Sequence, residues 1–160
     1  HIFSGRDAAG GIATAEDVLR VLSRGAAAAL LGTRFAATEE SDAHDSYKRA
    51  LVDAPEGTTV RTKCFDGMWP DAPHRVLRNS TYEKWNAAGC PPPGHRPGED
   101  DVVLMTDGVA FKRYSMVPPG ARMTGEPEAA ALYAGYGVGK VGDCPPVAAV
   151  MRDLSSLIRS

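Results

Sequence analysis

The sequence predicts an α/β fold that forms the C-terminal part of a (β/α)₈ barrel. Two glycine-containing turns, Gly10-Gly11 and Gly32-Thr33, are separated by one helix-length segment. In such barrels, the loops after strands seven and eight hold phosphate-bearing cofactors with turns of this kind. The chain has 160 residues, whereas eight β/α units take roughly 250 residues. We therefore expect only the last two β/α units of a barrel.

The start of the chain also indicates a fragment. The first residues, His1-Ile2-Phe3-Ser4, are neither an initiator Met nor the basic and apolar regions of a signal peptide. No signal peptide or transit segment is visible, and we expect the chain to be the C-terminal part of a longer protein.

The first elements along the chain read strand, turn, helix, strand, turn. Residues 2–9 predict a strand, although Arg6 and Asp7 interrupt its apolar run. Thr14 predicts a helix N-cap, because Asp17 follows three residues later in the manner of a capping box. The helix is expected to end near Gly25. Residues 26–31 then predict a short buried strand whose alanines suit a crowded interior.

Further elements are expected after residue 35. Helical spacing of Tyr47, Ala50 and Leu51 predicts a helix over residues 43–54, and β-branched residues predict a strand over 58–65. Asn79-Ser80-Thr81 fits a glycosylation motif but is better interpreted as the start of a helix over 80–88. The last two predicted helices cover residues 126–133 and 145–158.

The two turns have the chemistry of a phosphate site. Glycine lacks a Cβ, so the backbone at Gly10, Gly11 and Gly32 can take positive φ and approach a ligand closely. Backbone N–H groups in such turns can then point at one anion, and the Thr33 hydroxyl can donate to a phosphate oxygen. Either turn alone would be a weak signal.

Composition favours small-molecule chemistry over other functions. The formal net charge is −2, so the basic surface that nucleic acids and anionic lipids require is not expected. No run approaches the ~18 apolar residues of a membrane-spanning helix, and we expect a soluble protein. Cys64, Cys90 and Cys144 are interpreted as free thiols in a reducing cytoplasm. His1, His44, His74 and His95 have no metal-ligand spacing, so no metal is predicted.

Several motifs together resemble the C-terminal part of the nitronate monooxygenases, formerly called 2-nitropropane dioxygenases. They extend over most of the chain. They are Ala8-Ala9-Gly10-Gly11-Ile12, Leu31-Gly32-Thr33-Arg34-Phe35 with Ala36-Ala37-Thr38-Glu39-Glu40-Ser41, Ala43-His44, Tyr47-Lys48, Arg75-Val76-Leu77-Arg78-Asn79, Met123-Thr124-Gly125 and Tyr133-Ala134-Gly135-Tyr136-Gly137-Val138-Gly139.

The resemblance implies a TIM barrel that binds FMN and oxidises alkyl nitronates with O₂ to a carbonyl compound and nitrite. It places the FMN phosphate on Gly10 and Gly11 in one turn and on Gly32 and Thr33 in the other. It adds cofactor contacts at Leu30 and Leu31. The family's catalytic His is expected in an N-terminal half that this chain does not contain, so no catalytic residue is assigned.

The resemblance also divides the chain into three parts. Residues 1–40 would form the terminal strands and phosphate turns, 41–125 an inserted or appended α+β subdomain, and 126–160 a flavin-proximal loop with closing helices. Within that loop, Tyr133 and Tyr136 are candidates to lie against the flavin ring; Tyr136 stands where Gln or Glu is common in similar proteins. Trp69, Trp85, Phe111 and Tyr114 are interpreted as packing aromatics.

Three alternatives stay open. Arg34 could pair with phosphate or form a structural ion pair with Glu39 or Asp42. The enzyme could be a flavin-dependent enoyl-ACP reductase that uses NAD(P)H, or the chain could be a non-catalytic fragment. The expected partners are a small nitronate and O₂, and homo-oligomerisation is left open.

Overall fold

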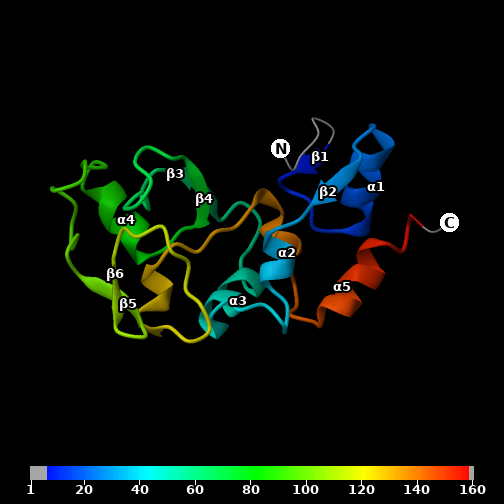
Figure 1. Cartoon of the computed structure of the whole chain (residues 1–160). Helices are drawn as coiled ribbons and strands as arrows, with labels where there is room; N and C mark the ends of the chain where they lie inside the picture. The colour runs from blue at the N-terminus through cyan, green and yellow to red at the C-terminus, as the bar shows by residue number, and fades with distance from the viewer. Residues whose placement is uncertain (1–6, 159–160) are drawn as a thin grey trace. The chain divides into compact units, whose positions relative to one another are not determined.

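The computed structural model describes residues 7–158 of the chain, which contain both helices and strands (Figure 1). In chain order the elements are β1 (Asp7–Ala9), α1 (Ala15–Ser23), β2 (Ala28–Leu30), α2 (Thr33–Ala36), α3 (Asp45–Val52), β3 (Thr59–Thr62), β4 (His74–Leu77), α4 (Ser80–Ala87), β5 (Val102–Thr106), β6 (Val109–Lys112), β7 (Thr124–Gly125), the 3₁₀ turns η1 (Pro127–Ala129) and η2 (Tyr136–Lys140), and α5 (Val147–Leu154).

The chain divides into two compact units. Unit 1 holds the residues up to Ser41, Lys48–Gly57 and the residues from Ala134 onward. Unit 2 holds Asp42–Tyr47 and Thr58–Tyr133. The chain therefore passes between the units four times, after Ser41, inside α3, after Gly57 and just before Ala134.

Unit 1 is built on one β–α–β unit, formed by β1, α1 and β2. β1 pairs in parallel with β2, with Ala8 opposite Ala29. The connecting helix α1 begins with a complete capping box, in which the Thr14 side chain accepts from the Asp17 amide and Asp17 bonds back to the Thr14 amide. The apolar face of this unit packs Ile12 and Val18 against Val150 and Leu154 of α5.

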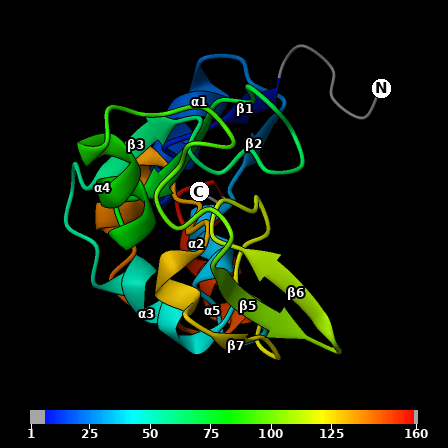
Figure 2. The ribbon, with the colours of Figure 1, turned by 90° about the vertical axis from the view of Figure 1, so that its left-hand side faces the viewer.

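Unit 2 contains two antiparallel sheets. β3 pairs with β4, and a second sheet has the order β6–β5–β7. Figure 2 shows β5 and β6 as a long hairpin. One core packs Phe65, Val76, Tyr82 and Tyr114 together, with Cys64 and Ala131 also buried there. A smaller core lies under β5 and includes Val103, Leu104, Ala129 and Ala130.

Most predicted elements are confirmed by the structure. These are the strand ending at Ala9, the capped helix after Thr14, the strand before Gly32, the helices within 43–54, 80–88 and 145–158, and the strand within 58–65. Residues 2–6 of the first predicted strand, with Arg6, lie outside the described residues. The α/β fold is thus confirmed, whereas its place as the last two units of a barrel stays a prediction.

The predicted helix over 126–133 is wrong. Only Pro127–Ala129 form a short 3₁₀ turn, and Ala130 is already extended. Leu132 instead accepts a backbone hydrogen bond from the Leu77 amide, and Tyr133 forms a β-bridge with Val76. Pairing with β4 therefore outweighs the helix propensity of this alanine-rich run.

Two predictions about burial are also wrong. Trp69 is 65% exposed, because it lies in the turn after Asp66 rather than in a core. Ala28 and Leu30 of β2 are exposed as well, although the strand was expected to be buried. Among the described residues β2 pairs only with β1, so one edge of the strand has no neighbour.

No helix in residues 7–158 is long and apolar enough to cross a membrane.

Candidate functional site

Both predicted glycine turns lie at the same edge of the β1–β2 sheet. The two strands are parallel, with Ala9 opposite Leu30, so their carboxyl ends coincide. Gly10-Gly11 follows β1 directly, and Gly32 follows β2 after Leu31. Ligands of open α/β sheets bind outside the carboxyl ends of the strands. The fold therefore brings the two predicted turns together where a ligand is expected.

The first turn requires glycine at both positions. Gly10 has φ +92° and Gly11 has φ +71°, in the left-handed region that other residues rarely adopt. Gly32 differs from the expectation, because its φ is −101°. A Cβ built on Gly32 would meet nothing within 4 Å. Gly32 thus leaves open space beside the backbone instead of permitting an unusual conformation.

A third segment, Gly135 to Lys140, closes onto these turns. The Gly135 amide donates to Thr33 Oγ1 at 2.9 Å. A Cβ on Gly11 would lie 3.7 Å from Tyr136 Cβ, and one on Gly137 would lie only 3.1 Å from the Gly11 carbonyl oxygen. Sequence analysis did not predict this contact between segments that lie more than 100 residues apart.

We call Gly10, Gly11, Gly32, Thr33 and Gly135 the cradle. Within residues 7–158, the amides of Gly11, Gly32 and Thr33 donate to no protein acceptor. The Thr33 hydroxyl accepts from Gly135, so its own hydrogen is left to donate elsewhere. Amides and a hydroxyl without acceptors, at a turn with positive φ, are the donor set of an anion-binding nest.

Tyr136 extends from the cradle into solvent. Its side chain is 70% exposed, although its backbone lies against Gly11. A large aromatic ring exposed to this degree beside the cradle is suited to stack on a planar ligand. Tyr133, the second aromatic candidate, belongs to unit 2, and its hydroxyl donates to the Met116 carbonyl.

An ion pair fastens the far end of the third segment. Lys140 Nζ lies 2.9 Å from both carboxylate oxygens of Asp17, which is 2% exposed. Arg20 Nη2 also contacts Asp17 at 2.8 Å. Burial raises the pKa of Asp17, but the Lys140 ammonium and the Ala13 amide outweigh it and hold this pKa below the ordinary value. Asp17 is therefore ionised at neutral pH.

Three other residues that sequence analysis considered for cofactor binding, Leu30, Leu31 and Arg34, lie next to the second turn. Leu31 packs in the core of unit 1, whereas Leu30 is exposed. Arg34 is buried, and its guanidinium bonds the backbone and side chain of Asp143 at 3.2 and 2.8 Å. Arg34 therefore forms a structural ion pair, but with Asp143 instead of the expected Glu39 or Asp42.

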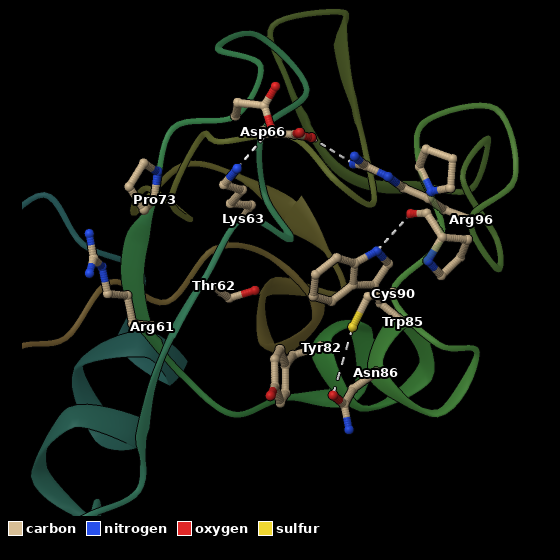
Figure 3. Close-up of a pocket in the computed structure, with 13 residues that line it drawn as sticks. Arg61, Thr62, Lys63, Asp66, Pro73, Tyr82, Trp85, Asn86, Cys90 and Arg96 are labelled. Atoms are coloured by element: carbon tan, nitrogen blue, oxygen red, sulfur yellow. Dashed lines mark hydrogen bonds and ion pairs between the residues drawn. The ribbon is translucent and has the colours of Figure 1, made fainter.

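Unit 2 has a pocket of its own, of about 610 Å³ (Figure 3). Its lining includes Trp85, Lys63, Thr62 and the buried Asp66–Arg96 pair. Arg96 Nη1 bonds Asp66 Oδ1 at 2.7 Å, and the guanidinium carbon lies 5.1 Å from the Tyr114 ring centroid. Among the described residues, Arg96 Nε is the one buried side-chain nitrogen or oxygen without a partner. The two paired carboxylates, Asp66 and Asp71, neutralise most of the positive charge here.

His74 and Cys64 make packing contacts in unit 2. His74 packs between Phe65 and Tyr133, and its Nε2 accepts from the Phe65 amide. Burial raises the pKa of the Cys64 thiol to about 12, so this group is not a nucleophile at neutral pH. In the part of the chain that the structure describes, no three His, Cys, Asp or Glu side chains are grouped to hold a metal ion.

Comparison with known proteins matches the chain to one family. The family model described as nitronate monooxygenase covers residues 8–156. Two curated relatives are both (3aS,4S,5R,7aS)-5-hydroxy-7a-methyl-1-oxo-octahydro-1H-indene-4-carboxyl-CoA dehydrogenases. The one from Mycobacterium tuberculosis is 42% identical over 77 residues, which is 48% of this chain and 21% of that protein. The one from Rhodococcus jostii is 30% identical over 164 aligned positions, 86% of this chain and 45% of that protein.

Two solved structures share the fold. Nitroalkane oxidase from Streptomyces ansochromogenes is 27% identical with a TM-score of 0.61, over 94% of this chain and 38% of that one. FabK from Thermotoga maritima is 23% identical with a TM-score of 0.60, over 96% of this chain and 45% of that one. The chain thus spans less than half the length of each of these proteins. The names of the family, the dehydrogenases and the nitroalkane oxidase all denote oxidoreductases.

Proposed function

The chain belongs to the nitronate monooxygenase family, and we propose that its protein oxidises alkyl nitronates with O₂ on FMN, whose phosphate the cradle binds. The observation that carries this proposal is the meeting of both glycine turns and Gly135 at the carboxyl edge of the β1–β2 sheet. The products would be a carbonyl compound and nitrite.

The described residues fit the phosphate of such a cofactor. The amides of Gly11, Gly32 and Thr33 have no protein acceptor within residues 7–158, and an open space adjoins Gly32 where a side chain would otherwise lie. The five residues of the cradle carry no side-chain charge, so the donors that they offer a phosphate are backbone amides and the Thr33 hydroxyl. Fixed backbone dipoles of this kind bind phosphate without a basic side chain.

Each residue of the cradle has a separate task in this proposal. Gly10 and Gly11 bring the first turn close to the phosphate, and Gly32 leaves the space that a phosphate oxygen would fill. The Gly135 amide orients the Thr33 hydroxyl so that its hydrogen is donated to the ligand. Tyr136 would lie beside the ring system, and Leu30 and Leu31 would add contacts with the cofactor next to the second turn.

When bound, the cofactor's isoalloxazine ring would supply the redox chemistry, and the protein would supply binding and orientation. No described residue is proposed as the catalytic base.

Steady-state assays with purified holoprotein test this function. We expect O₂ uptake and nitrite release with an alkyl nitronate and no pyridine nucleotide. The enoyl-ACP reductase alternative instead requires NAD(P)H and an enoyl thioester. Turnover that depends on NAD(P)H, without nitrite release from any nitronate, would refute the proposal and favour the reductase.

A second candidate is dehydrogenation of a carboxyl-CoA thioester. The observation that favours it is the similarity to two dehydrogenases of this kind, one of which aligns with 86% of the chain. Both candidates use the same cradle and differ in the substrate. A bicyclic carboxyl-CoA thioester is therefore the second substrate in the assay, with reduction of the flavin under anaerobic conditions as the readout.

A further inference from the structure

The segment that carries Tyr136 is attached at both ends to the first two β/α turns. At its start, the Gly135 amide donates to Thr33 Oγ1, the residue that opens α2. At its end, Lys140 bonds both carboxylate oxygens of Asp17, in the first turn of α1. The first attachment is thus to a side chain that follows β2, and the second is to a side chain that follows β1.

Between these attachments the backbone of the segment is closely packed at Gly137 and Gly139. A Cβ on Gly137 would lie 3.1 Å from the Gly11 carbonyl oxygen and 3.2 Å from Ala13 Cβ. A Cβ on Gly139 would lie 2.7 Å from the Glu56 amide nitrogen, closer than real Cβ atoms approach. Gly137 thus lets the segment lie directly on the backbone of the first turn, and Gly139 lets it lie on the backbone of Glu56.

The Asp17 carboxylate joins two functions in one group. It completes the capping box of α1 by accepting from the Ala13 and Thr14 amides, and it binds Lys140. Because Asp17 is 2% exposed, its pairing with Lys140 is screened less by solvent than a surface pair. Any motion of Lys140 away from Asp17 would leave a buried carboxylate with fewer partners.

We propose that Lys140 is a positioning residue, which through Asp17 holds η2 and Tyr136 over the cradle. The inference rests on the proposed function, since the cradle's ligand is taken to be FMN. Lys140 does not contact the phosphate in this account. It fixes the segment that lies beside the ring, so its loss affects contacts with the ring and leaves contacts with the phosphate intact.

The chain offers a matched control for this idea. Arg20 also pairs with Asp17, at 2.8 Å, but it lies on α1 itself, three residues from Asp17. Arg20→Met therefore removes one positive charge from the same carboxylate without releasing η2. Lys140→Met removes an equal charge and releases the segment.

Three measurements on the purified protein test the proposal. They are the Kd for FMN, the Kd for inorganic phosphate as a probe of the cradle alone, and hydrogen exchange of the amides from Tyr136 to Lys140 without FMN. Lys140→Met should weaken FMN binding about ten-fold, which corresponds to roughly 1.4 kcal/mol, because η2 and Tyr136 are no longer held beside the ring. It should leave phosphate affinity within two-fold and speed the exchange. Lys140→Arg should restore FMN binding, and Arg20→Met should resemble wild type.

Equal effects of Lys140→Met and Arg20→Met would overturn the proposal, since they would reflect charge alone. Unchanged FMN affinity and unchanged exchange in Lys140→Met would overturn it as well. If Lys140→Met does not fold, Lys140→Gln takes its place in the same comparison. Failure of wild-type protein to bind FMN would instead refute the proposed function, while the exchange measurement would still decide whether Lys140 holds the segment.

Discussion

At the residue scale, the two glycine positions of the cradle differ in what they require. Gly11 has φ +71°, so any side chain there strains the backbone whether or not a ligand is bound. Gly32 has an ordinary φ and open space around a built Cβ. A substitution at Gly11 should therefore lower the stability of the fold, whereas a substitution at Gly32 should affect ligand binding alone.

We predict that Gly32→Ala leaves the stability of the protein nearly unchanged and weakens FMN binding by ten-fold or more, because the methyl group occupies the space assigned to the phosphate. Gly11→Ala should lower both stability and affinity. Thermal unfolding without ligand and flavin titration check the two effects. Wild-type FMN affinity in Gly32→Ala would show that the phosphate does not lie beside Gly32.

The Asp66–Arg96 ion pair is buried in unit 2, so we expect it to matter for the stability of the fold. We predict that Asp66→Asn destabilises the protein by about 3 kcal/mol, because the Arg96 guanidinium would remain buried without its counter-charge. Asp71→Asn is the control, since the exposed Lys63–Asp71 pair contributes little. Asn also tolerates the positive φ of residue 71. Urea unfolding measures both variants, and equal losses would contradict this account.

His74 gives the stability a defined pH dependence. Burial lowers its pKa below 6.5, although the Ala72 carbonyl opposes this effect. As pH falls through 6.5, the unfolded state binds the proton first, so the free energy of unfolding should decrease until the pKa of the folded state is passed. His74→Gln should reduce this slope, because Gln does not titrate and can still accept from the Phe65 amide. Urea unfolding at several pH values between 5 and 8 checks it, and equal slopes in the two proteins would exclude His74 as the cause.

At the scale of elements, local patterns predicted those elements that local interactions decide. The Thr14–Asp17 capping box marks the start of α1, and Asn79 caps α4 by accepting from the Tyr82 amide. The run from Glu126 to Tyr133 had helical composition but pairs with β4, a partner some 50 residues away. The exposed turn at Trp69 is likewise decided by tertiary context that an aromatic residue alone does not reveal.

The η2 segment is the element that we expect to contact the flavin ring. We predict that Tyr136→Ala changes the visible absorbance spectrum of the flavin or the kcat and KM for nitronate, while FMN stays bound, because the cradle's phosphate donors lie elsewhere. Tyr136→Phe should keep most of the wild-type behaviour, since the ring face is retained. If spectra and kinetics are unchanged in Tyr136→Ala, the Tyr136 side chain does not contact the flavin ring.

At the scale of the whole molecule, the sequence predicted that the two turns lie together but not which other segments contact them. The glycine turns follow parallel strands, so their meeting at one edge could be predicted from Gly10, Gly11, Gly32 and Thr33. The contribution of Gly135 and Lys140 could not, because no local signal links them to Thr33 and Asp17. Family membership covers residues 8–156, yet the chain spans less than half of its solved neighbours. Cofactor binding by the cradle is therefore the property that can be tested most directly in this chain.

The most direct test compares the Kd of FMN with that of riboflavin, which lacks the phosphate, in wild-type protein and in Thr33→Val. We predict that wild-type protein binds FMN at least a hundred-fold more tightly, about 2.8 kcal/mol for several phosphate hydrogen bonds. Thr33→Val should lose a large part of this preference, and Thr33→Ser should keep it. Equal affinities for FMN and riboflavin in wild-type protein would contradict the claim that the cradle binds the flavin phosphate.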